Sequence, residues 1–568
     1  MKLEIAKIIF GFLSKRGVKL DKDSIEKLIE IPPNSEMGDF AFPCFVLAKD
    51  LRKAPQQIAE DLAVEISKSK NNFEKVQAQG PYVNFFVKRG NFAEDTIKTI
   101  LKEKGKYGMG TQKGKVMTEF CHANTHKAFH IGHTRNISLG ESVSRILEFS
   151  GLKVIRTNYQ GDIGMHVAKT LWGLLNLKKI GLKEPTKDKG KWLGLVYAKA
   201  SAMAKDEKIN AEVNEINQKL YAGDKKLIAL WKKTRQWSID YFEKTVYPDF
   251  QVKFNRFYFE SEVEKKGISI VKELEKKGVA KVDRGAVIMD YQEQGMGIYI
   301  LLKSDGTPLY STKDLALAEL QNKEYNPDKI LHIVASEQNL YFRQLIKTLE
   351  FYDKKLADKE KHMSYELVIL PSGKMASREG NVILYDDTLA KLISLIEKEI
   401  KQRDSKISKK ELDTRARKIA LCAVKYAMLS QDIKRTIVFN EEEITRFDGN
   451  TGPYIQYSYA RASSILKKVK QKNFQKFKVG ELEKHEIELS KKLSEFGDVA
   501  RDAAEKYNPA LIAHYSYELA QMFSEFYHTC PVLQDEKKKD FRLALVESFR
   551  VVLKNSLNLL GIETLEEM

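Results

Sequence analysis

The sequence predicts an α/β protein with a parallel sheet in its middle part and helices in its last third. Residues 115–121 alternate in polarity like a strand, 133–149 carry apolar residues at helical spacing, and 153–158 have the pattern of a second strand. These three segments complete a β-α-β unit. A further apolar run of strand length covers 329–334. From about residue 405 onward the apolar spacing is helical to the end.

The length of 568 residues is too great for one core and indicates three or four domains. Residues 1–112 are expected to form a compact α+β module, with helices over 3–14 and from Pro55 to Ile66 and with a turn at Gly80 that leads into a strand. Its last part, 104–110, is rich in glycine and is expected to be a linker. Residues 113–405 then hold the parallel sheet, and 406–568 form a helical domain.

A Lys-rich helical segment at about 181–245 is expected to be an insertion between two halves of the parallel sheet. Strand signals resume over 279–302. A last apolar run at 367–370 predicts a strand that leads into a loop.

The composition is typical of a soluble globular enzyme, with 43% hydrophobic and 31% charged residues. The net charge of +18 suits a polyanionic partner such as RNA, although scattered lysines are equally typical of a solvated exterior. The four cysteines are isolated, so a structural zinc site is not expected and a reducing cytoplasm is favoured. The sequence has no apolar stretch long enough to predict a membrane span.

The run His130-Ile131-Gly132-His133 lies where the first predicted strand gives way to a helix. A helix N-terminus offers unpaired N–H groups and a positive dipole end to a phosphate. Gly132 allows a nucleotide to come close to the backbone, and two imidazoles can donate hydrogen bonds to a developing pentavalent phosphate. The alternative, that the histidines cap the helix or belong to a core, stays open at this point.

A second motif, Lys374-Met375-Ala376-Ser377-Arg378, follows the predicted strand at 367–370. Together and in this order, the two motifs indicate chemistry on the α-phosphate of ATP. In the helical third, 454–461 interleaves tyrosines with Gln456 and Arg461. Such aromatics are typical of a helix-bundle core, and Gln456 and Arg461 could also contact unpaired bases.

Residues 119–136, which contain the first motif, resemble the ATP signature of the arginyl-tRNA synthetases, a family of class I aminoacyl-tRNA synthetases. Matches at 38–43, 309–314, 447–457 and 560–562 extend the resemblance over essentially the whole chain. It implies a Rossmann-type catalytic domain at 113–405, an N-terminal α+β domain at 1–112 that contacts the tRNA elbow, and a C-terminal all-α anticodon-binding domain at 406–568.

The resemblance also implies a two-step reaction in which L-arginine is activated with ATP and Mg²⁺ and is then transferred to tRNA(Arg). A cytoplasmic monomer with no membrane partner is expected. The rivals that remain open are another class I synthetase, an adenylyltransferase that needs no tRNA, and a non-catalytic tRNA-binding paralogue.

The resemblance carries over a set of site residues. A guanidinium calls for carboxylates or amides in its plane, and Asp314 is the matched carboxylate, with Tyr310 one helical turn before it. The complete arginine set is Glu119, Asn124, Tyr310, Asp314 and Gln338. The ATP set is His130, Gly132, His133, Lys374, Met375 and Ser377, and the catalytic set is His130, His133, Lys127 and Lys374. The tRNA set is Asn84, Gln456, Arg461, Tyr527 and Met568.

The sequence departs from the family pattern in two places. Ser377 stands where many class I enzymes have a second loop lysine, and Lys127 occupies the family position thought to supply that charge, with an exposed loop lysine as the alternative. The segment Ala335-Ser336-Glu337-Gln338 differs from the usual family stretch, which puts the role of Gln338 in doubt.

Overall fold

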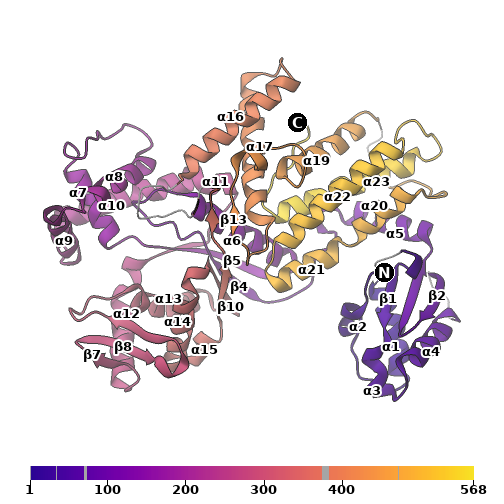
Figure 1. Ribbon diagram of the computed structural model, residues 1–568, viewed down its shortest axis with the longest axis horizontal. Helices are drawn as coiled ribbons and strands as arrows, with labels where there is room; N and C mark the ends of the chain where they lie inside the picture. Colours follow the sequence, from indigo (N-terminus) through magenta and orange to yellow (C-terminus); the bar gives the residue numbers. More distant parts are fainter. Residues whose placement is uncertain (1, 33–34, 69–72, 372, 374–382, 471–472) are drawn as a thin grey trace. The chain divides into compact units, whose positions relative to one another are not determined.

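The computed structural model describes residues 2–32, 35–68, 73–371, 373, 383–470 and 473–568 (Figure 1). Backbone packing divides the chain into two compact units. The first unit comprises Met1–Glu103, Gln471–Ser494 and Glu525–Ser548. The second unit comprises Lys104–Lys470, Glu495–Ser524 and Phe549–Met568, and it contains both predicted motifs.

The first unit is built on a three-stranded antiparallel sheet in the order β1-β3-β2. Its strands are β1 (Phe40–Pro43), β2 (Phe73–Gln79) and β3 (Tyr82–Val87). The main helices are α1 (Lys2–Ser14), α2 (Lys22–Leu28), α4 (Pro55–Ser67), α5 (Arg89–Glu103) and α20 (Lys484–Ser494). The helices predicted at 3–14 and from Pro55 to Ile66 are therefore confirmed. Apolar side chains of α1 and α4 pack with those of the sheet, so that Ile9, Leu62 and Phe85 are fully buried in one core.

The second unit contains a five-stranded parallel sheet in the order β11-β10-β4-β5-β6. The strands are β4 (Lys115–Glu119), β5 (Lys153–Gln160), β6 (Arg256–Phe259), β10 (Lys329–Ala335) and β11 (Glu360–Tyr365). The helix α6 (Ile131–Phe149) completes the predicted β-α-β unit. The chain adds strands on one side of β4 and then on the other. The junction of β4 and β10 is thus the switch point, where ligands of open α/β sheets bind.

The predicted helical insertion is confirmed as helical, but its expected position between two halves of the sheet is wrong. The helices α7 (Met165–Leu175), α8 (Lys189–Met203), α9 (Glu207–Tyr221), α10 (Lys225–Tyr241) and α11 (Tyr247–Phe250) all lie between β5 and β6. These two strands are neighbours in the sheet. The reason is that parallel neighbours need a crossover connection, and the insertion enlarges that crossover.

The strand signals at 279–302 form a separate antiparallel sheet, and they do not extend the parallel one. It contains β7 (Lys281–Asp283), β8 (Ala286–Tyr291) and β9 (Gly297–Leu302). The helices α12 (Glu260–Lys276) and α13 (Tyr310–Tyr325) flank it in sequence, and α14 (Asn339–Tyr352) follows β10. Figure 1 shows these three helices grouped with this small sheet.

Beyond the second motif the chain is helical, as predicted. The helices are α16 (Tyr385–Arg403), α17 (Lys409–Leu429), α18 (Glu441–Ile444), α19 (Gly452–Lys467), α21 (Phe496–Lys506), α22 (Ala510–Thr529) and α23 (Lys539–Leu559). The short strands β12 (Val368–Ile369) and β13 (Ile437–Val438) pair with each other. Helix α6 is tied to this region because the buried Arg135 donates to the carbonyl of Met428 and Ser142 Oγ lies 2.8 Å from the carbonyl of Leu559. Among the described residues, no helix combines the length and the apolar character that crossing a bilayer demands.

Candidate active site

A pocket of about 290 Å³ opens at the carboxyl ends of β4 and β10, at the switch point of the parallel sheet. All five residues of the predicted arginine set line it: Glu119, Asn124, Tyr310, Asp314 and Gln338. Glu119 ends β4, Gln338 ends the short turn after β10, and Tyr310 and Asp314 lie on α13. The sheet topology therefore brings together side chains that are widely separated in the sequence.

Asp314 is a partly buried carboxylate whose two oxygens differ in their surroundings. Its Oδ2 accepts a hydrogen bond from the hydroxyl of Tyr341 on α14, whereas Oδ1 is buried and has no partner among the described residues. Burial raises the pKa of Asp314 to about 7, against the opposing effect of the Tyr341 hydrogen bond. Tyr310, one turn earlier on α13, is 56% exposed and packs its ring 4.9 Å from that of Tyr341. A cation with N–H donors would satisfy the free oxygen and allow the carboxylate to ionise.

Glu119 is held from both sides by neighbouring side chains. Its Oε1 lies 2.8 Å from His332 Nδ1, and its Oε2 accepts a hydrogen bond from Gln321. Burial opposes its ionisation, but the positive charge and hydrogen bond of His332 lower its pKa overall. His332 also contacts Glu360 of β11, and both of these residues line the pocket.

The sequence analysis missed several pocket residues, most notably His332, Tyr341 and Glu260. His332 lies within the apolar run that predicted β10, where a polar side chain in a buried strand is itself a signal. Glu260 accepts a hydrogen bond of 2.8 Å from Lys313 Nζ and is thereby neutralised. Asn124 Oδ1 accepts a hydrogen bond of 2.9 Å from the backbone of Gly161.

The two histidines of the first motif lie at the N-terminus of α6, as predicted. The backbone N–H of His130 donates to Nδ1 of His133 over 3.3 Å, and the two rings stack with centroids 3.7 Å apart. Burial lowers the pKa of His130 to about 4 and that of His133 well below its usual value, and the charge of Lys127 acts in the same direction. Both rings are therefore neutral near pH 7. Because Nδ1 of His133 is an acceptor, its proton is on Nε2, which can donate to a ligand.

Gly132 has a steric role within the motif. A Cβ at this position would lie 3.0 Å from Cε1 and 3.1 Å from Nδ1 of His130, so a side chain here would push against the imidazole. The stacked arrangement of the two histidines thus depends on glycine, in addition to the expected approach of a nucleotide.

Lys374, Met375 and Ser377 lie outside the described residues. The segment that follows them is hydrogen-bonded to the first motif. The N–H of Ile131 donates to the carbonyl of Ile383 over 3.2 Å, and the N–H of Tyr385 donates to the carbonyl of Phe129 over 3.1 Å. Residues 383–385 therefore lie directly beside the histidine turn.

The helical insertion supports the loop that precedes the histidines. Nε2 of His126 lies 2.8 Å from the hydroxyl of Thr234, and the N–H of His126 donates to the hydroxyl of Ser238 over 2.9 Å, both on α10. In the same loop, Lys127 Nζ lies 5.4 Å from the ring centroid of Tyr197 on α8. The structure thus locates the insertion against the first motif, which the sequence left undecided.

The five predicted tRNA contacts are distributed over both units. Asn84 is buried on β3 and donates to Gln79 over 3.1 Å, while Tyr527 on α22 is 38% exposed. Gln456 is fully buried on α19, where its amide donates to the carbonyl of Glu563 over 2.7 Å and so holds the C-terminal segment. Arg461, on the same helix, stacks on the ring of Tyr457 at 4.9 Å. Met568 is the last residue.

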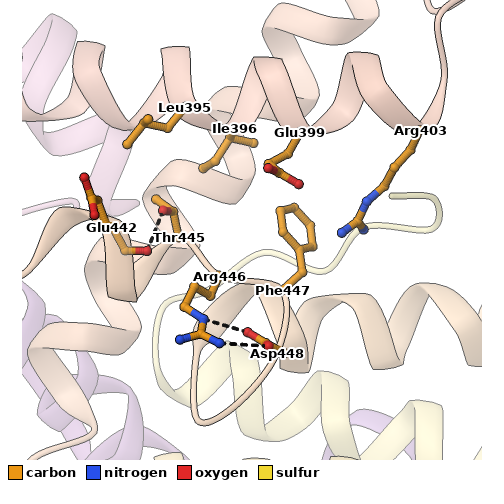
Figure 2. A pocket seen from close by; sticks show the side chains of 9 residues that line it. All are labelled: Leu395, Ile396, Glu399, Arg403, Glu442, Thr445, Arg446, Phe447 and Asp448. Atoms are coloured by element: carbon orange, nitrogen blue, oxygen red, sulfur yellow. Dashed lines mark hydrogen bonds and ion pairs between the residues drawn. The ribbon is translucent and has the colours of Figure 1, made fainter.

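A second hollow, of about 520 Å³, lies between α16 and the segment from Glu442 to Asp448 (Figure 2). Figure 2 shows Arg446 and Asp448 turned toward each other, in an ion pair of 2.9 Å. The guanidinium of Arg403 lies 4.4 Å from the ring centroid of Phe447. This hollow contains none of the predicted arginine or ATP residues.

Comparison with sequence families first defines the class of protein. Residues 96–440 match the family described as tRNA synthetases class I (R), catalytic domain. Residues 3–87 match the arginyl tRNA synthetase N terminal domain, and residues 455–568 match the DALR anticodon binding domain. The parallel sheet with its histidine turn is therefore a class I synthetase catalytic domain, and the predicted fold class is confirmed.

Comparison with individual proteins then gives the family. Arginine–tRNA ligase of Clostridium acetobutylicum is 37% identical over 559 residues, which are 97% of this chain and 98% of that protein. The ligase of Clostridium perfringens is also 37% identical, over 98% of each chain. The chain belongs to the arginine–tRNA ligase family.

Solved structures of the same name share the fold. Thermus thermophilus arginyl-tRNA synthetase superposes with a TM-score of 0.82 at 24% identity, over 99% of both chains. The enzyme of Plasmodium falciparum superposes with a TM-score of 0.78 at 21% identity, over 99% of this chain and 98% of that one.

Proposed function

We propose that the pocket at the ends of β4 and β10 binds L-arginine and that the adjoining His130–His133 turn binds ATP. The protein is an arginine–tRNA ligase. It activates L-arginine with ATP to arginyl-adenylate, releases pyrophosphate, and transfers the arginyl group to the 3′-terminal adenosine of tRNA(Arg).

The observation that carries the assignment of the pocket is that two of its buried carboxylate oxygens are unsatisfied among the described residues. Asp314 Oδ1 and Glu360 Oε1 are buried carboxylate oxygens that have no hydrogen-bond partner in the described part of the chain, and both residues line the pocket. Buried acceptors of this kind are costly unless a ligand satisfies them. Arginine is a suitable ligand because its guanidinium and its α-ammonium carry only donors.

The geometry supports a division of roles within the pocket. Asp314 is the charge partner of the guanidinium, with Tyr310 beside it on the same face of α13. Glu119, Asn124 and Gln338 hold the remaining polar groups of arginine, including the α-ammonium. The α-carboxylate then points toward the histidine turn, where the adenylate forms.

The histidines act on ATP as neutral donors. His130 and His133 donate to the oxygens of the α-phosphate as it becomes pentavalent, and because burial keeps both rings uncharged they do so without a change of protonation. Lys127 and Lys374 provide positive charge for the triphosphate, Met375 and Ser377 complete the nucleotide site, and Gly132 lets the nucleotide approach. Mg²⁺ arrives as part of the Mg-ATP substrate, held mainly by phosphate oxygens and water, which this ion prefers. Positioning and charge stabilisation thus account for most of the catalysis.

The tRNA is bound by an N-terminal domain at 1–112 and an anticodon-binding domain at 406–568, which precede and follow the catalytic domain at 113–405 in the sequence. We assign Arg461, Tyr527 and Met568 to direct contacts. Asn84 and Gln456 are buried, so their contribution is to hold the surfaces on which the tRNA rests. The enzyme works as a monomer in the cytoplasm, where its four free, buried thiols stay reduced.

The test is ATP–pyrophosphate exchange and aminoacylation with each of the twenty amino acids, with and without tRNA. Arginine should be the only substrate that is attached to tRNA. Attachment of another amino acid in preference to arginine would favour a different class I synthetase. An adenylylated product formed from a substrate other than an amino acid, in the absence of tRNA, would favour an adenylyltransferase.

A further inference from the structure

The floor of the arginine pocket holds a buried ionic triad made of Glu119, His332 and Glu360. These residues come from three adjacent parallel strands, because His332 of β10 is paired with Glu119 of β4 and β11 lies on the other side of β10. His332 Nδ1 is 2.8 Å from Glu119 Oε1, and its Nε2 contacts Glu360 Oε2. The residues are 2%, 5% and 9% exposed, in chain order. The triad is thus shielded from water on all sides except the pocket.

The geometry settles the charge of His332. An ionised carboxylate can only accept hydrogen bonds, and each ring nitrogen faces one. A neutral imidazole has a single N–H and would leave one nitrogen lone pair against a carboxylate. The doubly protonated ring satisfies both contacts, and the two carboxylates accordingly raise the pKa of His332 well above its usual value despite burial.

We propose that His332 is a positioning residue for arginine: as an imidazolium, it orients the ionised Glu119 carboxylate and brings the charge of the pocket to the value that a substrate with two cationic groups requires. This inference rests on the proposed function of the pocket. His332 acts through Glu119, which faces the substrate, and needs no contact of its own with arginine.

The charge of the pocket is set by the carboxylates that line it and by the cations bound to them. The four carboxylates are Glu119, Glu260, Asp314 and Glu360. Lys313 neutralises Glu260 through a contact of 2.8 Å; it also lies 3.4 Å from Glu264, whose pKa is raised by burial. The His332 imidazolium neutralises one of the others. With Asp314 ionised, two negative charges remain, which match the guanidinium and the α-ammonium of arginine. Without the imidazolium three would remain, and the third would oppose ionisation of Asp314.

The groups that face each titrating side chain come from several elements. Around Asp314 they are two carboxylates, one histidine and four tyrosines. The carboxylates are Glu119 of β4 and Glu260 of α12, and the histidine is His332 of β10. The tyrosines are Tyr159 of β5, Tyr299 of β9, Tyr310 on the same helix as Asp314, and Tyr341 of α14. Around His332 they are Glu119, Glu360, His122 of the loop after β4, and His362 of β11. The two carboxylates Glu119 and Glu260 raise the pKa of Asp314, whereas the charge of His332 lowers it.

The experiment compares His332→Gln with a matched control, His362→Gln. His362 is the strand partner of His332 and stacks on Phe342 at 4.3 Å, but its Nε2 lies 2.9 Å from the carbonyl of Val334 and not against a carboxylate. Steady-state aminoacylation is measured from pH 6 to 9 with arginine and ATP varied separately. For His332→Gln we expect the KM for arginine to rise about tenfold or more, the KM for ATP to change less than about twofold, and the acid limb of kcat/KM for arginine to shift to higher pH. His362→Gln should show neither change.

A double variant separates the effect of the pocket's charge on the acid limb from the effect of His332 on the orientation of Glu119. In His332→Gln/Glu360→Gln one negative charge is lost together with the imidazolium, so the acid limb should return toward that of the wild type. The KM for arginine should stay raised, since Glu119 still lacks its charged neighbour. If His332→Gln does not fold, Glu360→Gln alone should move the acid limb to lower pH, with the imidazolium retained against Glu119.

Three results would overturn the inference. The first is a folded His332→Gln variant whose arginine KM and acid limb of kcat/KM equal those of the wild type, and the second is a His362→Gln variant with the same shifts as His332→Gln. The third is a Glu360→Gln substitution that leaves the acid limb unmoved, whether it is made in the wild type or in His332→Gln. These outcomes differ from failure of the proposed function, in which the wild-type enzyme itself would not charge tRNA with arginine.

Discussion

Replacing Asp314 with Asn removes a negative charge from the arginine pocket and keeps the shape of the side chain. The structure makes this the sharpest test of substrate recognition because Asp314 Oδ1 is buried and has no partner in the described structure, while Oδ2 is held by Tyr341. A guanidinium bound against an amide would lose its charge partner in a buried site, which costs about 2–4 kcal/mol. At 1.4 kcal/mol for each factor of ten, arginine binding should weaken about 30-fold to about 700-fold.

The same substitution should change the pH dependence. The pKa of Asp314 in the empty pocket is about 7, so the carboxyl is protonated at lower pH and must lose its proton before it can pair with the guanidinium. In the wild type, kcat/KM for arginine should therefore fall as the pH drops below about 7. In Asp314→Asn this acid limb should be absent.

Asp314→Asn should stabilise the free, folded enzyme at high pH, although it weakens the binding of arginine. Because burial raises the pKa of Asp314, the folded protein binds the proton more tightly than the unfolded chain does, and this stabilisation is lost as the pH rises to about 7. Above that pH the empty wild-type enzyme carries a buried, unpaired carboxylate. Asp314→Asn should thus have a higher melting temperature than the wild type at pH 8, and the gain should disappear near pH 4.

The assay is aminoacylation with arginine varied from pH 6 to 9, together with thermal melts of the free enzyme. Asp305→Asn is the matched control, because Asp305 lies on the surface, where the backbone N–H of Thr307 donates to it at 2.9 Å. An arginine KM and kcat in Asp314→Asn equal to those of the wild type would refute the assignment of this residue to the guanidinium.

Lys127→Ala should lower kcat much more than it raises the arginine KM, because Lys127 lies in the loop before the histidines and its charge acts on the triphosphate. The control is Tyr197→Leu, which removes only the ring beside Lys127. Normal turnover of Lys127→Ala would disprove this role of the lysine. Arginine-dependent pyrophosphate exchange should be negligible without tRNA, because Lys127 and Lys374 come from two separate segments that tRNA must bring together around the triphosphate. Vigorous exchange by tRNA-free enzyme would contradict this coupling. The affinity for tRNA should fall steeply as the salt concentration rises, as expected for a protein of net charge +18 that releases counterions from phosphates. A flat plot of the logarithm of the binding constant against the logarithm of the salt concentration would show that the positive charge does not contribute to tRNA binding. Arg542→Ala should destabilise the first unit by about 3–5 kcal/mol in urea unfolding, because it removes the guanidinium that lies 2.7 Å from the fully buried Glu486 and leaves this carboxylate only the backbone N–H of Glu483 and the more distant Lys538. A loss below about 1 kcal/mol would show that the pair is dispensable.

Much of the catalytic unit followed from local patterns. Residues 115–119, 131–149 and 153–160 form the predicted strand, helix and strand, because alternation and helical spacing of apolar residues report which face of each element is buried. The position of His130 and His133 at the start of α6 was equally predictable, since a helix terminus is a local event. The five arginine residues came from family resemblance, and spacing alone would not have identified them.

In the helical last third of the chain, local patterns did not predict which side chains are buried. The interleaved tyrosines of 454–461 were compatible with both a bundle core and a nucleic-acid surface. In the structure, Gln456 is buried beneath the C-terminal segment and donates to Glu563, whereas Arg461 stacks on Tyr457. Both side chains lie on α19, and only the packing of distant residues decides which of them is covered.

What the sequence determined by itself is therefore the local chemistry: the elements of the sheet, the histidine turn, the free cysteines and the excess of positive charge. The tertiary structure decided which residues meet. Parallel strands that are adjacent in space are far apart in the chain, so the contact of His332 with Glu119 and Glu360 depends on strand order and register and on no local signal. The placement of the insertion against His126, and the pKa of Asp314 near 7, have the same origin, because burial and neighbouring charges are properties of the assembled pocket.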